Sequence, residues 1–371
     1  MALFPYLHGS TSPPSLRRWR SCRFLLFCGF FLSFFTFLVF LRGYVMSQPP
    51  STVPVAQHYL KYTALKGFFV QDEPSKIDKD FDYAKSNLGL IDRKYPSDTE
   101  PDSSKQTTQW QRLENYIQTL NSHAAEDEQY KLLYFGRHGE GEHNVAEAKY
   151  GTEAWDCYWS KLEGDGELKW ADAHLTPEGE QQALTANKFW AKALKEEKIP
   201  APESYYSSPL DRCCNTASLT FEGLDLPKDK PFKPLIKELM REVVGVHTCD
   251  RRSSATAIKS RWPNFTFEPN FAEEDPLWVA DIRESDSQLD QRIKTLLDDI
   301  FTNDKHTYIS LTSHSGAIGG FLRVLGHEPF GLQTGGVIPV LVKAERVRGQ
   351  PPPVKVAPGI PPPTCPPPPG V

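Results

Sequence analysis

Two histidines and two arginines stand in short polar runs that follow apolar, β-forming segments. Arg137 and His138 follow the first such segment, Arg212 lies shortly after a second, and His314 follows a third. Open α/β sheets bind their ligands at the carboxyl ends of the strands. Guanidinium groups bind phosphate oxygens bidentately and offset the charge of a phosphoryl group during transfer. These residue types at these positions therefore predict a pocket for a tetrahedral dianion.

The elements that must position these residues alternate between strand and helix patterns from Lys131 onward. The expected strands cover residues 132–135, 204–207, 308–311 and 337–342. Helices are expected at 110–120, from Thr176 and Pro177 onward, after Pro209, around 289–300 and after His314. This alternation predicts a three-layer α/β/α sandwich with a mostly parallel central sheet.

Four sequence motifs resemble those of the histidine phosphatase superfamily, the phosphoglycerate-mutase-like proteins with an R-H-G signature. They are R-H-G-x(4)-N at 137–144, L-T-P-x-G-x-x-Q-A at 175–183, S-S-P-L-x-R-C-x-x-T at 207–216 and S-H-S-G at 313–316. The run at 245–252, G-V-H-T-C-D-R-R, is most similar to the fungal phosphomutase-like proteins. The resemblance implies a phosphoglycerate-mutase-like fold.

The resemblance also implies a mechanism through a phosphohistidine intermediate, with no metal and no cofactor. His138 is then the nucleophile. The phosphoryl group is held by Arg137, Asn144, Arg212 and His314. His314 also counts among the catalytic residues. Nucleophilic catalysis divides the displacement into two easier steps.

A carboxyl group must protonate the leaving oxygen. In the family this acid lies near an L-x-E-x(3)-G pattern, and Glu242 is the predicted acid because it shortly precedes Gly245. The spacing is one residue shorter than the common pattern, so Glu238 stays an alternative. Arg251 and Arg252 are predicted either to bind a second anionic group of the substrate or to form an exposed salt-bridging loop.

The predicted function is a phosphomonoesterase acting on a small phosphorylated substrate. One alternative is a phosphoglycerate-type mutase, although the chain lacks the R-R-S-Y-D-x-P-P-like run of the glycolytic enzymes. Another is a catalytically silent, membrane-tethered binding protein. The net charge of −5 gives no reason to expect nucleic acid as a partner. The sequence predicts neither the substrate nor an oligomeric state.

The N-terminus contains an uncharged run at 24–41 with eight phenylalanines, bounded by arginines. As a helix it is about 27 Å long, close to the hydrocarbon thickness of a bilayer. The predicted organisation is a basic segment at 1–23, a transmembrane anchor at 24–41, an arm with a helix at 47–130 and a catalytic domain at 131–347. A cleaved signal peptide, and hence secretion, is the alternative.

Basic residues before the run place the N-terminus in the cytosol and the catalytic domain in the lumen or outside the cell. The sequon Asn264-Phe265-Thr266 is usable only on that side. The proline-rich segment 348–371 is predicted to be a disordered tail, since it cannot build a core. It is a linker, a docking strip or an artefact of the gene model. The sequence contains no C-x-x-C pair that would suggest a metal site. The adjacent Cys213 and Cys214 are expected to be packing residues.

Overall fold

The computed structural model describes residues 57–77, 81–98 and 107–366. They belong to the second of the two units into which the chain divides, Ala56–Val371. The predicted basic segment and transmembrane anchor lie outside the described residues. Among those described, no helix is both long and apolar enough to cross a bilayer.

Apolar side chains of the central strands alternate between two buried faces. In β2 (Glu128–Arg137), Leu133 and Phe135 join one apolar cluster, while Leu132 and Tyr134 join another on the opposite face. Successive side chains of a strand point to opposite sides of the sheet. A strand that is apolar on both sides therefore requires helices on both sides.

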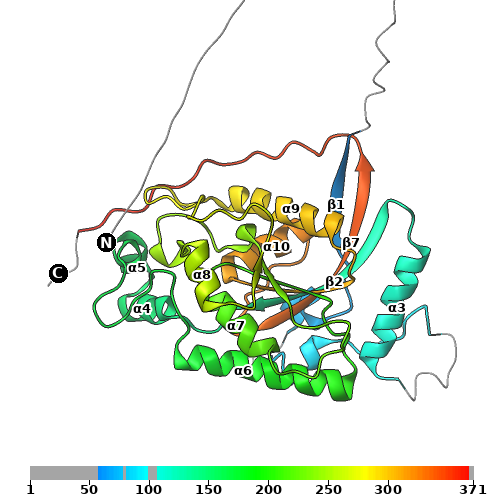
Figure 1. The fold of residues 1–371 in the computed structure, drawn as a ribbon. Helices are drawn as coiled ribbons and strands as arrows, with labels where there is room; N and C mark the ends of the chain where they lie inside the picture. Colours follow the sequence, from blue (N-terminus) through cyan, green and yellow to red (C-terminus); the bar gives the residue numbers. More distant parts are fainter. Residues whose placement is uncertain (1–56, 78–80, 99–106, 367–371) are drawn as a thin grey trace, which may run out of the picture. The chain divides into compact units, whose positions relative to one another are not determined.

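Helices on both faces of the sheet meet that requirement (Figure 1). Helices α9 (Asp286–Asn303) and α10 (Ser315–Leu325) cover one face. Helices α3 (Gln109–His123) and α6 (Pro177–Lys192) cover the other, and α7 (Asp211–Phe221) packs beside α6. The three-layer sandwich predicted from the sequence is confirmed.

The sheet has seven strands in the order β1-β7-β2-β6-β3-β4-β5. The remaining strands are β1 (His58–Ala64), β3 (Ser204–Ser207), β4 (Pro234–Ile236), β5 (Thr266–Phe267), β6 (Tyr308–Ser313) and β7 (Val337–Arg348). Strand β7 runs antiparallel to both of its neighbours, β1 and β2, and the other pairings are parallel. The sheet is mostly parallel, as expected, with an antiparallel edge built from the N-terminal arm and the last strand.

Short helices complete the fold above the sheet. These are α4 (Glu142–Tyr150), α5 (Thr152–Cys157) and α8 (Ala255–Arg261). As predicted, α6 begins after Thr176, whose side chain accepts the N–H of Gly179, and has Pro177 at its first position.

The C-terminal segment differs from its sequence-based expectation. Strand β7 extends to Arg348, six residues beyond the predicted end, because it pairs with both β1 and β2. Residues 349–366, here called the strap, then run extended along α9 toward α5 (Figure 1). A polyproline-type segment needs no core of its own to be held against a domain, because it has little conformational freedom to lose.

Candidate active site

The predicted pocket forms where β2, β3 and β6 end side by side. In the parallel register, Arg137 pairs with Ser313 and Ser207 pairs with Thr312, so the three strands finish at the same edge of the sheet. The backbone N–H of His138 donates to Ser313 O at 3.0 Å and thereby continues the ladder one residue further. A cavity of about 370 Å³ opens at this edge. Its polar lining includes Arg137, His138, His143, Asn144, Arg212, Glu242, His247, Asp250 and Arg283.

His138 is buried and held in one tautomer. Its Nδ1 lies 2.7 Å from the carbonyl oxygen of Gly139, which can only accept, so Nδ1 carries the proton. Burial, followed by the positive charges of Arg212 and Arg137, holds the pKa of His138 well below its usual value of 6.5. At neutral pH the imidazole is therefore uncharged and keeps a lone pair on Nε2, as a nucleophile requires.

Arg137 and Arg212 line the cavity from the end of β2 and the first turn of α7. Arg137 donates from Nη1 to Leu332 O at 2.8 Å. Arg212 donates to Cys249 O at 2.6 Å and to Asp250 Oδ1 at 2.9 Å. The Nε–H groups of both arginines are buried and have no acceptor within the described part of the chain. Two fixed guanidinium groups beside an uncharged imidazole are the arrangement expected of a site that binds phosphoryl oxygens.

Asn144 and His143 enter the cavity together on the first turn of α4. The side-chain oxygen of Asn144 accepts the N–H of Gly141 at 3.0 Å, which orients the amide. The ring of His143 lies 5.3 Å from that of His138, and burial followed by Arg212 holds its pKa well below the usual value. Sequence reasoning did not select His143, although it stands directly before Asn144 in the R-H-G-x(4)-N motif.

His314 lies behind His138 rather than in the cavity wall. The two rings are 5.1 Å apart, and His314 is completely buried. Its Nε2 lies 2.8 Å from Ser208 Oγ and 3.4 Å from Cys213 Sγ. Burial and then Arg212 lower its pKa far below the usual value. The structure thus brings His314 next to the predicted nucleophile, while its role as a phosphate ligand stays a prediction.

The two candidate acids occupy different environments. Glu242 lines the cavity at the N-terminus of α10 and accepts backbone N–H groups from Val243, Gly316 and Ala317 at 2.9–3.0 Å. Glu238 lies outside the cavity lining and pairs with Arg252 at 2.8 Å and Arg241 at 3.2 Å. Of the two candidates, only Glu242 lines the cavity.

Arg251 and Arg252 do not line the cavity. The guanidinium of Arg252 is buried against Glu238 and the carbonyl oxygens of a neighbouring loop. Arg251 forms a partly exposed pair with Glu163. Both arginines form salt bridges, as in the second alternative, but Arg252 is buried and not part of an exposed loop. The third arginine of the cavity is Arg283, which sequence reasoning missed because no motif surrounds it.

Arg283 and His247 extend the cavity away from His138. Arg283 donates to Gly245 O at 3.0 Å and contacts Asp250 Oδ2 at 3.3 Å, so Asp250 links it to Arg212. Burial, followed by Arg283, lowers the pKa of His247 to about 4. The indole ring of Trp155 lines the cavity, packs edge-on against His247 and belongs to an aromatic cluster with Trp159 and Trp170.

A possible metal-ligand set exists at His247, Cys249 and Asp250, whose ligand atoms lie within 4.8 Å of one another. Both carboxylate oxygens of Asp250 already face arginines, Arg212 on one side and Arg283 on the other. A cation there would meet two guanidinium charges. This donor set does not suit a metal ion.

Comparison with known proteins identifies the family. Residues 133–334 match the model of the histidine phosphatase superfamily, branch 1, a range that includes the carboxyl ends of β2, β3 and β6. The chain belongs to this superfamily, whose members include phosphatases and mutases. The predicted family is confirmed.

Three of the named relatives are fungal proteins. A probable phosphoglycerate mutase of Arthroderma benhamiae is 54% identical over 286 residues, covering 77% of this chain and 85% of that protein. Phosphomutase-like protein 3 of Candida albicans is 39% identical over 58% of this chain and 66% of its own length. A probable phosphoglycerate mutase of Saccharomyces cerevisiae is 35% identical over 63% of this chain and 84% of its own length.

Proposed function

We propose that this protein is a phosphomonoesterase that hydrolyses a small phosphorylated substrate through a phosphohistidine intermediate. The observation that carries the proposal is the uncharged His138, held by the Gly139 carbonyl, between Arg137 and Arg212 in one cavity. Such a site binds a dianion and offers it an unprotonated nitrogen.

The reaction follows from these positions. His138 Nε2 attacks phosphorus, the P–O bond to the alcohol breaks, and the leaving oxygen takes a proton from Glu242. Water then attacks phosphorus, gives a proton to Glu242, and the P–N bond breaks to release inorganic phosphate and restore His138. Arg137 and Arg212 offset the charge that builds on the phosphoryl oxygens in both steps.

Replacement of the nucleophile tests the proposal. With p-nitrophenyl phosphate as substrate, we expect His138→Ala to lower kcat by at least about a thousandfold, since the phosphohistidine can no longer form. His123→Ala, an exposed histidine on α3, is the matched control and should keep full activity. Equal turnover by His138→Ala and the unmodified protein would overturn the mechanism, and no turnover by either would favour the silent binding protein.

A mutase is the second candidate, because two of the relatives are named as probable phosphoglycerate mutases. A mutase must keep water from the phosphoenzyme until its intermediate reorients. Incubation with 3-phosphoglycerate, followed by phosphorus NMR, separates the two activities. Inorganic phosphate as product supports the phosphatase, and an isomeric phosphoglycerate supports the mutase.

We further propose that the catalytic domain lies in the lumen or outside the cell, behind the anchor predicted at 24–41. Two features support this location: a disulfide between Cys157 and Cys365, since such bonds persist in oxidising compartments, and the exposed Asn264 of the sequon. We expect endoglycosidase to increase the electrophoretic mobility of the native protein, and alkaline carbonate to leave it in the membrane fraction. Unchanged mobility together with a soluble protein would reject the proposal.

A further inference from the structure

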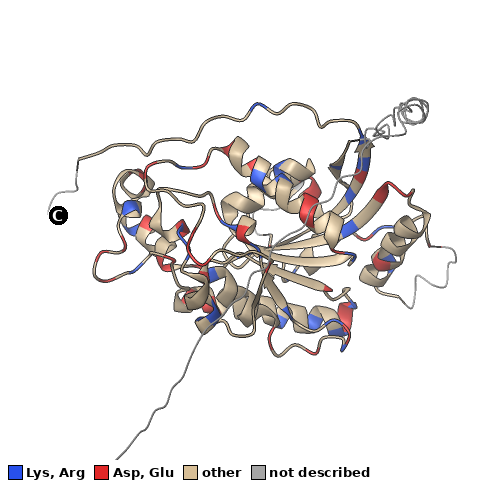
Figure 2. Ribbon diagram, turned by 45° about the horizontal axis from the view of Figure 1, so that its top comes forward, with Lys and Arg blue, Asp and Glu red and all other residues tan. Residues whose placement is uncertain are grey.

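The strap (residues 349–366) crosses the catalytic domain as an almost uncharged band. Its sequence holds a single charged residue, Lys355 (Figure 2). It leaves the end of β7, passes along α9 and ends beside α5 (Figure 1). Segments that carry no core of their own are held only by the contacts they make, and the strap makes several.

Three ties hold the strap to the domain. At the start of α9, Ala357 exchanges hydrogen bonds with Ser285 and Ser287 at 3.0 and 2.8 Å. In the middle, Ile360 and Arg283 pair through their backbones, with bonds of 2.7 and 2.8 Å. Gly359 allows this approach, since a Cβ there would lie 2.3 Å from the side chain of Ile282.

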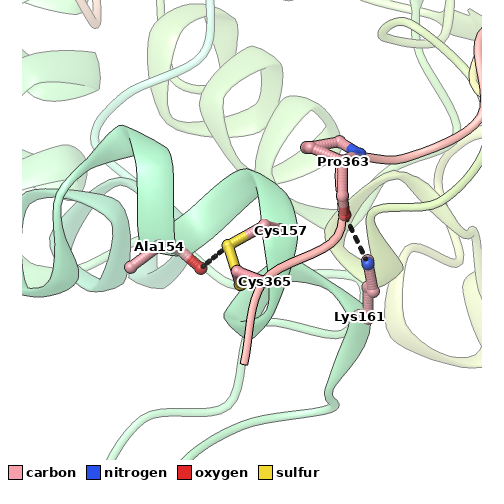
Figure 3. Close-up of a disulfide and its surroundings, with 5 residues drawn as sticks. All are labelled: Ala154, Cys157, Lys161, Pro363 and Cys365. Atoms are coloured by element: carbon pink, nitrogen blue, oxygen red, sulfur yellow. Dashed lines mark hydrogen bonds between the residues drawn. A yellow bond between two sulfur atoms is a disulfide. The ribbon is translucent and has the colours of Figure 1, made fainter. Parts of the chain in front are cut away.

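The third tie is covalent (Figure 3). Cys365 forms a disulfide with Cys157 at the end of α5, and nearby Lys161 donates to Pro363 O at 3.1 Å. Cys157 directly follows Asp156, which lines the catalytic cavity. One end of the segment 360–363 is therefore fastened to Arg283, which lines the catalytic cavity, and the other end to Cys157, the neighbour of the cavity residue Asp156.

A second cavity, of about 360 Å³, lies under this segment. Residues 360–363 form one wall, and four residues line both this cavity and the catalytic one: Asp156, Val243, His247 and Arg283. Arg283 joins them most directly, because its guanidinium contacts Asp250 in the catalytic cavity while its backbone pairs with Ile360 of the strap. The two cavities adjoin across these shared side chains.

Side chains of the outer cavity favour an uncharged, apolar occupant. The strap supplies isoleucine and proline, and the facing wall supplies Val243 and Val246. The charged groups among its described lining residues are Asp156, Arg283, Glu284 and Asp286. The guanidinium of Arg283 is engaged by Asp250, and the carboxylate of Glu284 is paired with Arg292 at 2.6 Å. The described lining residues thus offer no unpaired cation to a second anionic group, whereas the apolar surface of an occupant would lose contact with water.

We propose that the outer cavity is a leaving-group subsite for phosphate monoesters whose alcohol part is extended and apolar, and that the strap is its specificity-determining wall. The proposal rests on the proposed phosphatase function and names its substrate class. The phosphoryl group lies at His138, and the alcohol part passes Arg283 and His247 to reach the segment 360–363.

The test compares hexyl phosphate with methyl phosphate, two alkyl esters with the same leaving-group chemistry. Only hexyl phosphate is long enough to reach beyond the phosphate site. We expect the unmodified protein to prefer hexyl phosphate at least tenfold in kcat/KM, because apolar contacts of a few methylenes discriminate by such factors. No preference would overturn the proposal.

Two variants test whether the strap causes the preference for hexyl phosphate. Ile360 is 56% exposed but lines the outer cavity, so Ile360→Asp places a charge in that wall and should reduce the preference for hexyl phosphate about tenfold. The double change Cys157→Ser and Cys365→Ser frees the end of the strap and should reduce it at least threefold. Val354→Asp, at a strap position that is 73% exposed and outside the cavity lining, is the matched control and should leave it within twofold. An unchanged preference in Ile360→Asp, or in the double serine variant if Ile360→Asp fails to fold, would overturn the proposal.

A binding experiment distinguishes a failure of the subsite proposal from a failure of the proposed phosphatase function. Hexylphosphonate and methylphosphonate carry the same head group and cannot be hydrolysed, and Trp155 in the cavity lining provides a fluorescence signal. If the protein hydrolyses no phosphate ester, the phosphatase proposal fails. A preference for hexylphosphonate that Ile360→Asp removes would still support the subsite, and equal affinity for the two phosphonates would reject it.

Discussion

At the scale of single residues, the site depends on the protonation state of its histidines. His138, His143 and His314 are all buried near Arg212, and burial is the largest cause of the low pKa of each ring. A protonated imidazole cannot attack phosphorus. Burial, with Arg212 as the second cause, keeps the proposed nucleophile His138 uncharged, and the same arginine is a proposed ligand of the phosphoryl group.

Glu242 is expected to act as the acid, and the dependence on the leaving group tests this role. An alkoxide needs a proton to leave, whereas p-nitrophenolate does not. We expect Glu242→Gln to lower kcat for an alkyl phosphate by about 10²–10⁴-fold and for p-nitrophenyl phosphate by less than about tenfold.

Glu238→Gln is the matched control for that experiment. It removes a charge from the buried cluster with Arg241 and Arg252, so it should lower thermal stability. The ratio of alkyl to aryl turnover should stay as in the unmodified protein. A ratio that moved in Glu238→Gln and not in Glu242→Gln would exchange the two assignments.

The low pKa of His247 leads to a prediction about how the stability of the folded protein depends on pH. Its pKa is about 4 in the folded protein against 6.5 when unperturbed, so between these values the unfolded chain binds a proton that the folded protein does not. Stability is therefore lost as the pH falls from 6.5 to 4, by about 3 kcal/mol for this residue.

Urea unfolding at pH 7 and at pH 4 measures that loss. In His247→Gln the difference in unfolding free energy between the two pH values should shrink by about 3 kcal/mol. The exposed His123→Gln serves as the comparison and should leave the difference unchanged. An unchanged difference in His247→Gln would contradict the burial argument.

At the scale of elements, the N-terminus of α10 positions Glu242. The carboxylate accepts the N–H groups of Gly316 and Ala317, and it can approach because residue 316 has no side chain. A Cβ at this position would lie 2.3 Å from Glu242 Oε1. The helix start and the glycine together determine where the acid lies.

Gly316→Ala should therefore displace Glu242 and reproduce much of the Glu242→Gln defect, with a loss of about tenfold or more on alkyl phosphates. Gly319→Ala on the same helix is the matched control. Its Cβ would meet only the end of the Arg323 side chain, at 3.6 Å, and alanine favours a helix over glycine by up to about 1 kcal/mol. Equal activities of the two variants would show that the glycine has no positioning role.

At the scale of the whole molecule, the disulfide joins residues 208 positions apart. It connects the strap, which follows the antiparallel edge of the sheet, to α5 above the catalytic cavity. A cross-link of this span restricts the unfolded chain over most of the catalytic domain.

We expect the double change Cys157→Ser and Cys365→Ser to lower the free energy of unfolding by about 2–4 kcal/mol, measured by urea denaturation under non-reducing conditions. The unmodified protein in excess reductant should unfold at the same midpoint as the variant. Identical midpoints for the oxidised unmodified protein and the variant would show that the cross-link does not contribute to stability.

Much of the fold and site could be predicted because the relevant signals are local. The apolar runs before Arg137, Ser208 and His314 mark strands, and parallel strands finish at one edge. Local patterns also predicted the helix start at Thr176. The strand β1 was missed, because His58–Ala64 is a lone edge strand whose pairing with β7 depends on residues almost 300 positions away.

The sequence by itself determined the family and the α/β/α sandwich. It also determined that Arg137, His138, Asn144 and Arg212 lie close to His314. Strand periodicity and short motifs each depend on only a few consecutive residues, so the sequence alone reveals them. Only the tertiary structure showed that Glu242 and not Glu238 lines the cavity, that Arg283 lines it while Arg251 and Arg252 do not, and that Cys157 is joined to Cys365. Each of these depends on which distant segments approach one another. That approach is set by packing over the whole domain, and no local spacing encodes it.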